Sequence, residues 1–168
     1  VVQRGVNDHT IMDLLEYFRG SGHIVRFIEF MDVGTLNQWD LSKVVPAREL
    51  RDMIHDRWPL EAMGHNYHGE VAKRYTYADG EGEIGFITSV TEPFCGDCNR
   101  ARLSADGEMF TCLFANKGAD LRAALRAGAS DEHMFEMIRD IWLLRSDRYS
   151  ALRSTVKKAS AEQDRVEM

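Results

Sequence analysis

The segment HTIMDLLEYFRGSGHIVRFIEFMDV, residues 9–33, sets the fold of the N-terminal part of the chain. A helix is predicted by four apolar residues at helical spacing: Ile11, Leu14, Leu15 and Phe18. The glycines in 20–22 end that helix, and residues 23–33 are rich in β-branched and aromatic side chains that favour a strand. Residues 1–8 predict an earlier strand, after which Asp8 can cap the helix. Strand, helix and strand in this order predict a βαβ unit with parallel strands.

Beyond this unit the pattern changes to hairpins and short helices. Pro46 suits the first turn of a short helix, after a loop whose path the sequence leaves open. Two strand-like runs, residues 72–78 and 82–90, are joined through an Asp-Gly turn and predict an antiparallel hairpin. Residues 100–114 predict a second hairpin that turns at Asp106-Gly107. Two further helices are expected, the second with Ser130 as its cap; they cover residues 119–128 and 130–152.

The sequence therefore predicts an α+β fold in three parts. Residues 1–32 form a piece of a parallel α/β architecture, and residues 33–156 form a domain of antiparallel hairpins and helices. Residues 157–168 are polar, and we expect a mobile tail.

Composition excludes several classes of protein. The chain has 168 residues, of which 44% are hydrophobic and 29% charged, as in globular domains. The formal net charge of −6 gives no reason to expect nucleic acid as a partner, and no apolar run approaches the length of a membrane span. The start of the sequence lacks both an initiator methionine and a signal-peptide pattern, so we expect a piece of a longer protein. An odd number of cysteines, three, favours the reducing cytoplasm.

The three cysteines form the main chemical motif. Cys95 and Cys98 lie in PFCGDCNRAR, residues 93–102, and Cys112 follows in the second hairpin. Two cysteines separated by two residues can bind one metal centre, since the turn aims both sulfurs the same way, and Gly96 permits a tight backbone there. The hairpin returns the chain, so Cys112 can approach the pair. Three thiolates would leave one position of an iron–sulfur cluster open to a substrate.

Other interpretations of the cysteines stay open. A disulfide would leave one thiol over, and a thioredoxin-like pair would require a helix where the sequence predicts a strand. A zinc site of three cysteines and one histidine could take its histidine from His55, His65 or His68. In that case the chain would be a zinc-stabilised interaction module. Buried thiols in a metal-free binding domain are a further alternative.

Two arginines follow the cysteine pair. Arg100 and Arg102 are two residues apart, so both can face one side of a strand. Arginine is suited to bidentate phosphate contacts, although an isolated pair of this kind is usually a solvated strand face. A strict two-residue turn at Asp106-Gly107 would pair Cys112 with Ala101, beside neither arginine.

The segment PFCGDCNRARLSADGEMFTCLFA, residues 93–115, resembles the molybdenum cofactor biosynthesis protein A family. The pattern is C-x2-C-N-R-x-R-L-x-x-D-G, followed by a third cysteine after thirteen intervening residues. The resemblance extends upstream to RGVND and VRFIEFMDVG, and downstream to Lys117–Arg122 and the closing RVEM. It covers essentially the whole chain.

The resemblance implies a GTP 3',8-cyclase of the radical S-adenosylmethionine class, a lyase of the first step of molybdopterin synthesis. Such an enzyme is an incomplete, TIM-like α/β barrel whose N-terminal [4Fe-4S] cluster sits on a CxxxCxxC loop and cleaves S-adenosylmethionine. The resulting radical takes hydrogen from C3' of GTP, which then bonds to C8 of guanine. A second [4Fe-4S] cluster binds the purine. The pathway partner implied is cyclic pyranopterin monophosphate synthase.

The resemblance also implies roles for individual residues. Cys95, Cys98 and Cys112 match the ligands of the second cluster. Arg100 and Arg102 match arginines that hold the GTP triphosphate. Arg26 and Met31 match positions that line the S-adenosylmethionine site, although a salt-bridged strand residue and a core methionine explain them equally well.

The chain also departs from the family pattern. The sequence contains no CxxxCxxC and lacks most of the barrel strands and the family's terminal glycine pair. We therefore expect a fragment that binds the second cluster and GTP but is not catalytic by itself. The barrel edge that the missing strands would cover is expected to pair with another copy, as a homodimer or a swapped assembly.

Overall fold

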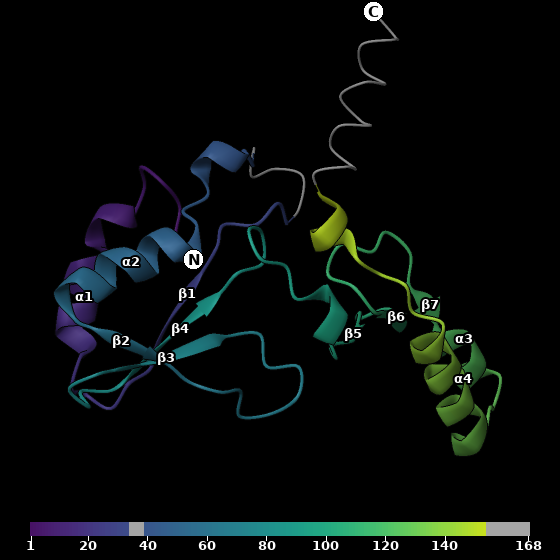
Figure 1. The fold of residues 1–168 in the computed structure, drawn as a ribbon. Coiled ribbons are helices and arrows are strands. Elements are labelled where there is room, and N and C mark those ends of the chain that lie inside the picture. Colours follow the sequence, from purple (N-terminus) through teal and green to yellow (C-terminus); the bar gives the residue numbers. More distant parts are fainter. Residues whose placement is uncertain (34–38, 154–168) are drawn as a thin grey trace, which may run out of the picture. The chain divides into compact units, whose positions relative to one another are not determined.

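The computed structural model describes residues 1–33 and 39–153, which fall into two compact units (Figure 1). The units are Val1–Cys98 and Asn99–Met168. The predicted tail at residues 157–168 lies outside the described residues. No helix in the described part of the chain has the length and apolar character needed to cross a membrane.

The first unit is a four-stranded sheet with two helices. Its strands lie in the order β1-β4-β3-β2, with β1 parallel to β4 and the other pairs antiparallel. The strands are β1 (Val25–Ile28), β2 (Leu60–Ala62), β3 (Lys73–Tyr77) and β4 (Glu83–Ile87), and the helices are α1 (Ile11–Phe18) and α2 (Ala47–Arg57).

Both helices contribute to one hydrophobic core with the sheet. In β1 and β4, Phe27 lies opposite Phe86, and their rings stack with centroids 5.9 Å apart. Tyr75 of β3 meets Phe86 edge to face. Since side chains alternate along a strand, Arg26 and Ile28 point to the other face of the sheet. The helices supply five buried side chains to this core: Ile11, Leu15, Ala47, Leu50 and Ile54.

In place of the predicted N-terminal strand, the segment makes two isolated bridges. Val2 bridges Glu29 in parallel and Gln3 bridges Val44 antiparallel, whereas β1 pairs in parallel with β4. The prediction that Asp8 caps the helix is wrong. The Asp8 carboxylate accepts the backbone N–H of Gly5 (2.9 Å), and the residue that precedes α1 is Thr10. A turn at Gly5, with φ +74°, thus takes the place of an extended strand.

Two other local predictions are confirmed. The helix expected from Pro46 is α2, although Pro46 occupies the N-cap position, one residue before the first turn that the sequence predicts for it. The hairpin expected from residues 72–90 is β3 and β4, which pair antiparallel.

The second unit has a small antiparallel sheet and two helices. Its strand order is β5-β6-β7. Ser130 accepts the N–H of His133 (3.3 Å) and caps α4, as the sequence predicts. The elements are β5 (Arg102–Leu103), β6 (Glu108–Phe110), β7 (Ala119–Asp120), α3 (Leu121–Arg126) and α4 (Asp131–Leu143).

The described elements form the α+β fold that the sequence predicts. The relationship of residues 1–32 to a TIM-like barrel stays a prediction, as does the division at residue 32. In this chain β1 shares one sheet with β2, β3 and β4, so the segments before and after residue 32 lie in the same compact unit.

Candidate functional site

The cysteine pair lies on a short turn at the end of the first unit. Cys95 begins the 3-10 turn η3 (Cys95–Asp97), and Cys98 is the residue that ends it. Cys112 follows β6 in the second unit. All three are half-buried thiols, and none is in a disulfide. Because the boundary between the units falls directly after Cys98, the meeting of the three sulfurs stays a prediction.

Neither unit alone assembles a metal site from its described residues. No group of three or more His, Cys, Asp or Glu side chains in the described ranges is placed to hold a metal ion. Of the histidines considered for zinc, His55 uses its Nδ1 to accept the backbone N–H of Leu60 (3.0 Å). His65 and His68 lie in the loop between β2 and β3, where both line a hollow together with Asp97.

The chain just before the cysteines is held by a buried carboxylate that sequence reasoning missed. Glu29, at the end of β1, is 3% exposed. It accepts the backbone N–H groups of Val90 and Thr91, both at 2.8 Å, and the Thr91 hydroxyl. It also accepts the N–H of Ala47 at the start of α2 (3.0 Å). One side chain thus links β1, α2 and the segment that leads to Cys95.

The arginines that follow the pair lie in the second unit. Arg102 begins β5 opposite Phe110, and Arg100 precedes the strand. The hairpin has a three-residue turn, in which the Ser104 carbonyl accepts the N–H of Gly107 (3.0 Å) and the Ser104 N–H donates to Glu108 (2.9 Å). The observed register therefore differs by one residue from that of a strict two-residue turn. Gly107, at φ +86°, makes the longer turn possible.

Arg26 and Met31 lie in the first unit, on β1 and just after it. Arg26 is on β1, on the face of the sheet opposite the helices, and its Nη2 lies 3.7 Å from Oε1 of Glu70. Met31 follows β1 and is half-buried. The structure thus places both residues on one strand and its extension, five positions apart in the sequence.

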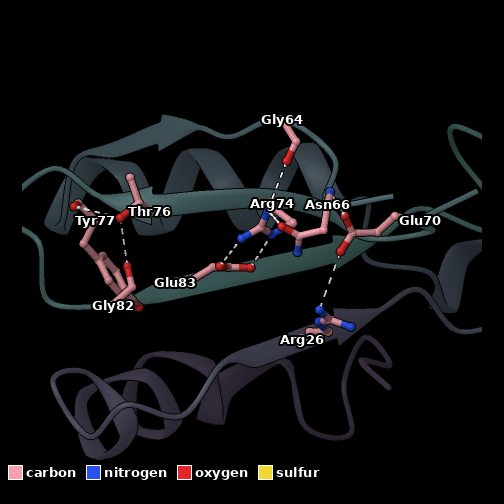
Figure 2. Close-up of polar contacts among 9 residues, drawn as sticks. All are labelled: Arg26, Gly64, Asn66, Glu70, Arg74, Thr76, Tyr77, Gly82 and Glu83. Carbon is pink, nitrogen blue, oxygen red and sulfur yellow. Dashed lines mark hydrogen bonds and ion pairs between the residues drawn. The ribbon is translucent and has the colours of Figure 1, made fainter. Parts of the chain in front are cut away.

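A polar network supports Arg26 from the neighbouring strands (Figure 2). Arg74 of β3 and Glu83 of β4 make two hydrogen bonds of 2.6 and 2.7 Å, and both side chains are largely buried. Arg74 also donates to Asn66 Oδ1 (2.6 Å), and the Asn66 N–H donates to Glu70 Oε2 (2.7 Å). The network connects three strands and the loop before β3.

A hollow of about 310 Å³ lies beside this network and the cysteine turn. Its wall carries both acidic and basic groups, which suits a polar ligand better than an apolar one. The charged or aromatic side chains that line it include His65, Glu70, Lys73, Glu92, Phe94 and Asp97.

The Arg74–Glu83 pair predicts a loss of stability in acid. The hydrogen bond from Arg74 holds the pKa of the Glu83 carboxyl below its ordinary value. A lowered pKa stabilises the fold above the ordinary carboxyl pKa, and this contribution is lost as the pH falls through the lowered value. We therefore expect Glu83→Gln to be less stable than the parent at pH 7, with a difference that shrinks between about pH 5 and about pH 3.

Urea unfolding followed by circular dichroism at each pH tests this prediction. The control is Glu61→Gln on β2, an exposed carboxylate, which should follow the parent at every pH. A Glu83→Gln variant that loses stability in acid as steeply as the parent would contradict the prediction.

Comparison with known proteins shows that the sequence of this chain matches one family. Residues 23–151 match the family described as Molybdenum Cofactor Synthesis C. A protein of Xanthomonas axonopodis pv. citri named GTP 3',8-cyclase is 53% identical over 158 residues, which are 94% of this chain and 47% of that protein. Proteins of the same name from Acidothermus cellulolyticus and Staphylococcus saprophyticus are 50% and 43% identical over 166 and 169 residues. The chain spans about half the length of these relatives.

Proposed function

Because the chain belongs to the Molybdenum Cofactor Synthesis C family, we propose that it is the C-terminal part of a GTP 3',8-cyclase. The observation that carries the proposal is the match over residues 23–151, which includes every residue of the candidate site. Relatives that carry the name share about half of its residues. The reaction would be the first step of molybdopterin synthesis, in the cytoplasm, upstream of cyclic pyranopterin monophosphate synthase.

The cysteines would hold a second [4Fe-4S] cluster. Cys95, Cys98 and Cys112 are half-buried thiols outside any disulfide, and thiolates are the ligands of such clusters, so the donor chemistry fits. When bound, a cluster with three protein ligands supplies an iron position that a purine base can occupy. The protein's own contribution would be to hold the Cys95–Cys98 turn in place, and the bonds of Glu29 to Val90 and Thr91 support this because they anchor the segment that leads to the turn.

The arginines would bind and orient the two substrates. Arg100 and Arg102 supply fork-shaped cations for the triphosphate of GTP. Arg26 and Met31 would line the site of S-adenosylmethionine. Correct orientation decides which C–H bond of the ribose the radical meets, so these residues act by positioning.

The remaining half of the enzyme would supply the rest of the barrel. In this proposal residues 1–32 are the last part of a TIM-like barrel, residues 33–156 are the domain that binds the second cluster and GTP, and residues 157–168 are a terminal tail. The CxxxCxxC loop that binds the first [4Fe-4S] cluster and S-adenosylmethionine is absent from this sequence, so the chain by itself should be inactive. Among the described residues β1 is the outermost strand of its sheet, with an isolated bridge from Val2 at its end, and this position supports self-association when the other strands are missing.

Anaerobic reconstitution with iron and sulfide tests the proposal. We expect a brown protein with about four irons per chain, and replacement of any one cysteine by serine should reduce iron retention severely. Replacing His55, His65 or His68 should not change the iron content. A colourless protein that holds one zinc, and that loses it on replacement of a histidine, would instead establish the zinc-stabilised interaction module.

A further inference from the structure

The Glu70 carboxylate is buried, and one of its oxygens has no hydrogen-bond partner among the described residues. Its side chain is 1% exposed. Oε2 accepts the N–H of Asn66 (2.7 Å), but Oε1 has no hydrogen-bond donor among the described residues. Burying a charged oxygen without a donor is costly, so a group at this position should have a charge to balance it.

Arg26 supplies that charge (Figure 2). Its Nη2 lies 3.7 Å from Glu70 Oε1, within the range of an ion pair and just beyond a hydrogen bond. The Arg26 side chain is 42% exposed. A guanidinium has five N–H donors in a planar fork, so one edge can face Glu70 while the other edge stays accessible.

The aliphatic stem of Arg26 packs over a glycine of the neighbouring strand. Gly85 of β4 lies directly opposite Arg26 in the register of the two strands. A Cβ on Gly85 would come within 3.3 Å of Arg26 Cγ and 3.5 Å of Ala72 Cβ. The absence of a side chain at Gly85 therefore gives the arginine stem a place on the sheet, beneath the loop that carries Glu70.

Glu70 is itself held by the strands. Its partner Asn66 accepts a hydrogen bond from Arg74, and Arg74 is paired with Glu83 by two hydrogen bonds. Both of those charged side chains are largely buried and belong to the central strands β3 and β4. The carboxylate that faces Arg26 is thus connected through Asn66 to the two inner strands of the sheet.

We infer that Glu70 is a positioning residue for Arg26, and that it turns the free edge of the guanidinium toward the carboxylate of S-adenosylmethionine. This inference rests on the proposed function, which assigns Arg26 to that site. A guanidinium binds a carboxylate by two parallel hydrogen bonds only when its plane is correctly oriented. Glu70 attracts the head of the side chain, and Gly85 leaves room for its stem.

A double-mutant cycle in the full-length enzyme that carries this chain tests the inference. The dissociation constant of S-adenosylmethionine is measured by calorimetry for the parent, Glu70→Gln, Arg26→Ala and the double variant. We expect Glu70→Gln to weaken binding about tenfold and Arg26→Ala at least as much. In the Arg26→Ala background, Glu70→Gln should change the constant by less than about twofold, since its effect passes through Arg26.

The controls separate positioning from a loss of stability. Thermal unfolding is recorded for each variant, and Glu61→Gln on β2 should bind as the parent does. An equal loss of affinity from Glu70→Gln in both backgrounds would overturn the inference, as would parental affinity in Glu70→Gln. If Arg26→Ala itself binds as the parent does, the assignment of Arg26 under the proposed function is wrong, and the inference ends with it.

Discussion

Replacing Glu29 by glutamine is expected to lower the free energy of unfolding of the first unit by about 3 kcal/mol. The carboxylate is buried and accepts hydrogen bonds from Ala47, Val90 and Thr91. Glutamine has the same length but only one accepting oxygen, and its amide would direct N–H groups at backbone N–H donors. Several donors would then be buried without an acceptor, each at a cost of about 1–3 kcal/mol.

Urea unfolding of Glu29→Gln gives the size of this effect, and hydrogen exchange gives its location. We expect the amides of Val90 and Thr91 to exchange faster than those of the β3–β4 pair, because the Glu29 bonds hold the segment after β4. The matched control is Glu61→Gln, an exposed carboxylate in the same unit, with a change within about 0.5 kcal/mol. Parental stability of Glu29→Gln would show that the buried carboxylate does not anchor this segment.

The Glu29 variant also bears on the proposed cluster. Cys95 follows the anchored residue Thr91 after three intervening residues. If the anchor positions the cysteine turn, Glu29→Gln should retain less iron after reconstitution than the parent under conditions where both are folded.

Replacing Phe86 by alanine should have the largest effect on the hydrophobic core, about 3–5 kcal/mol. Phe86 is 1% exposed in the central strand β4, stacks on Phe27 and meets Tyr75 edge to face. Both neighbours lie on other strands of the same sheet, so their backbones cannot close the space that the ring leaves. The cost therefore includes a cavity in addition to the lost burial.

The same urea experiment measures Phe86→Ala against Tyr67→Ala. Tyr67 is an aromatic residue of the first unit that is 59% exposed, so its removal should change the free energy of unfolding by less than about 0.5 kcal/mol. Similar losses from the two variants would contradict the assignment of Phe86 to the centre of the core. Phe86→Ala should also leave the second unit's helices folded if the two units unfold separately.

The local sequence was enough where neighbouring residues decide the structure. Three features depend on contacts within a few residues: helix α1, the hairpin of β3 and β4, and the Ser130 cap of α4. The cysteine motif likewise identified the family, because residue types at a fixed spacing are a local feature of the sequence.

Local reasoning failed where a competing partner, near or distant in the sequence, takes the place of the expected one. Asp8 can cap a helix, yet its carboxylate accepts the N–H of Gly5. The segment 1–8 has strand-forming residues, but β1 pairs over its whole length with β4, more than fifty residues later. The hairpin register depends on one extra residue in the turn at Gly107, which shifts every cross-strand pair.

By itself, the sequence determined the α+β class and the main local elements, and it predicts that the three thiols and two nearby arginines carry the chemistry. Only the tertiary structure decided that Glu29 anchors the segment before the cysteines and that Glu70 faces Arg26. The reason is physical. A glutamate in a sequence is by default an exposed, solvated charge, and it becomes a buried anchor only when folding brings backbone donors or a guanidinium from distant segments to it.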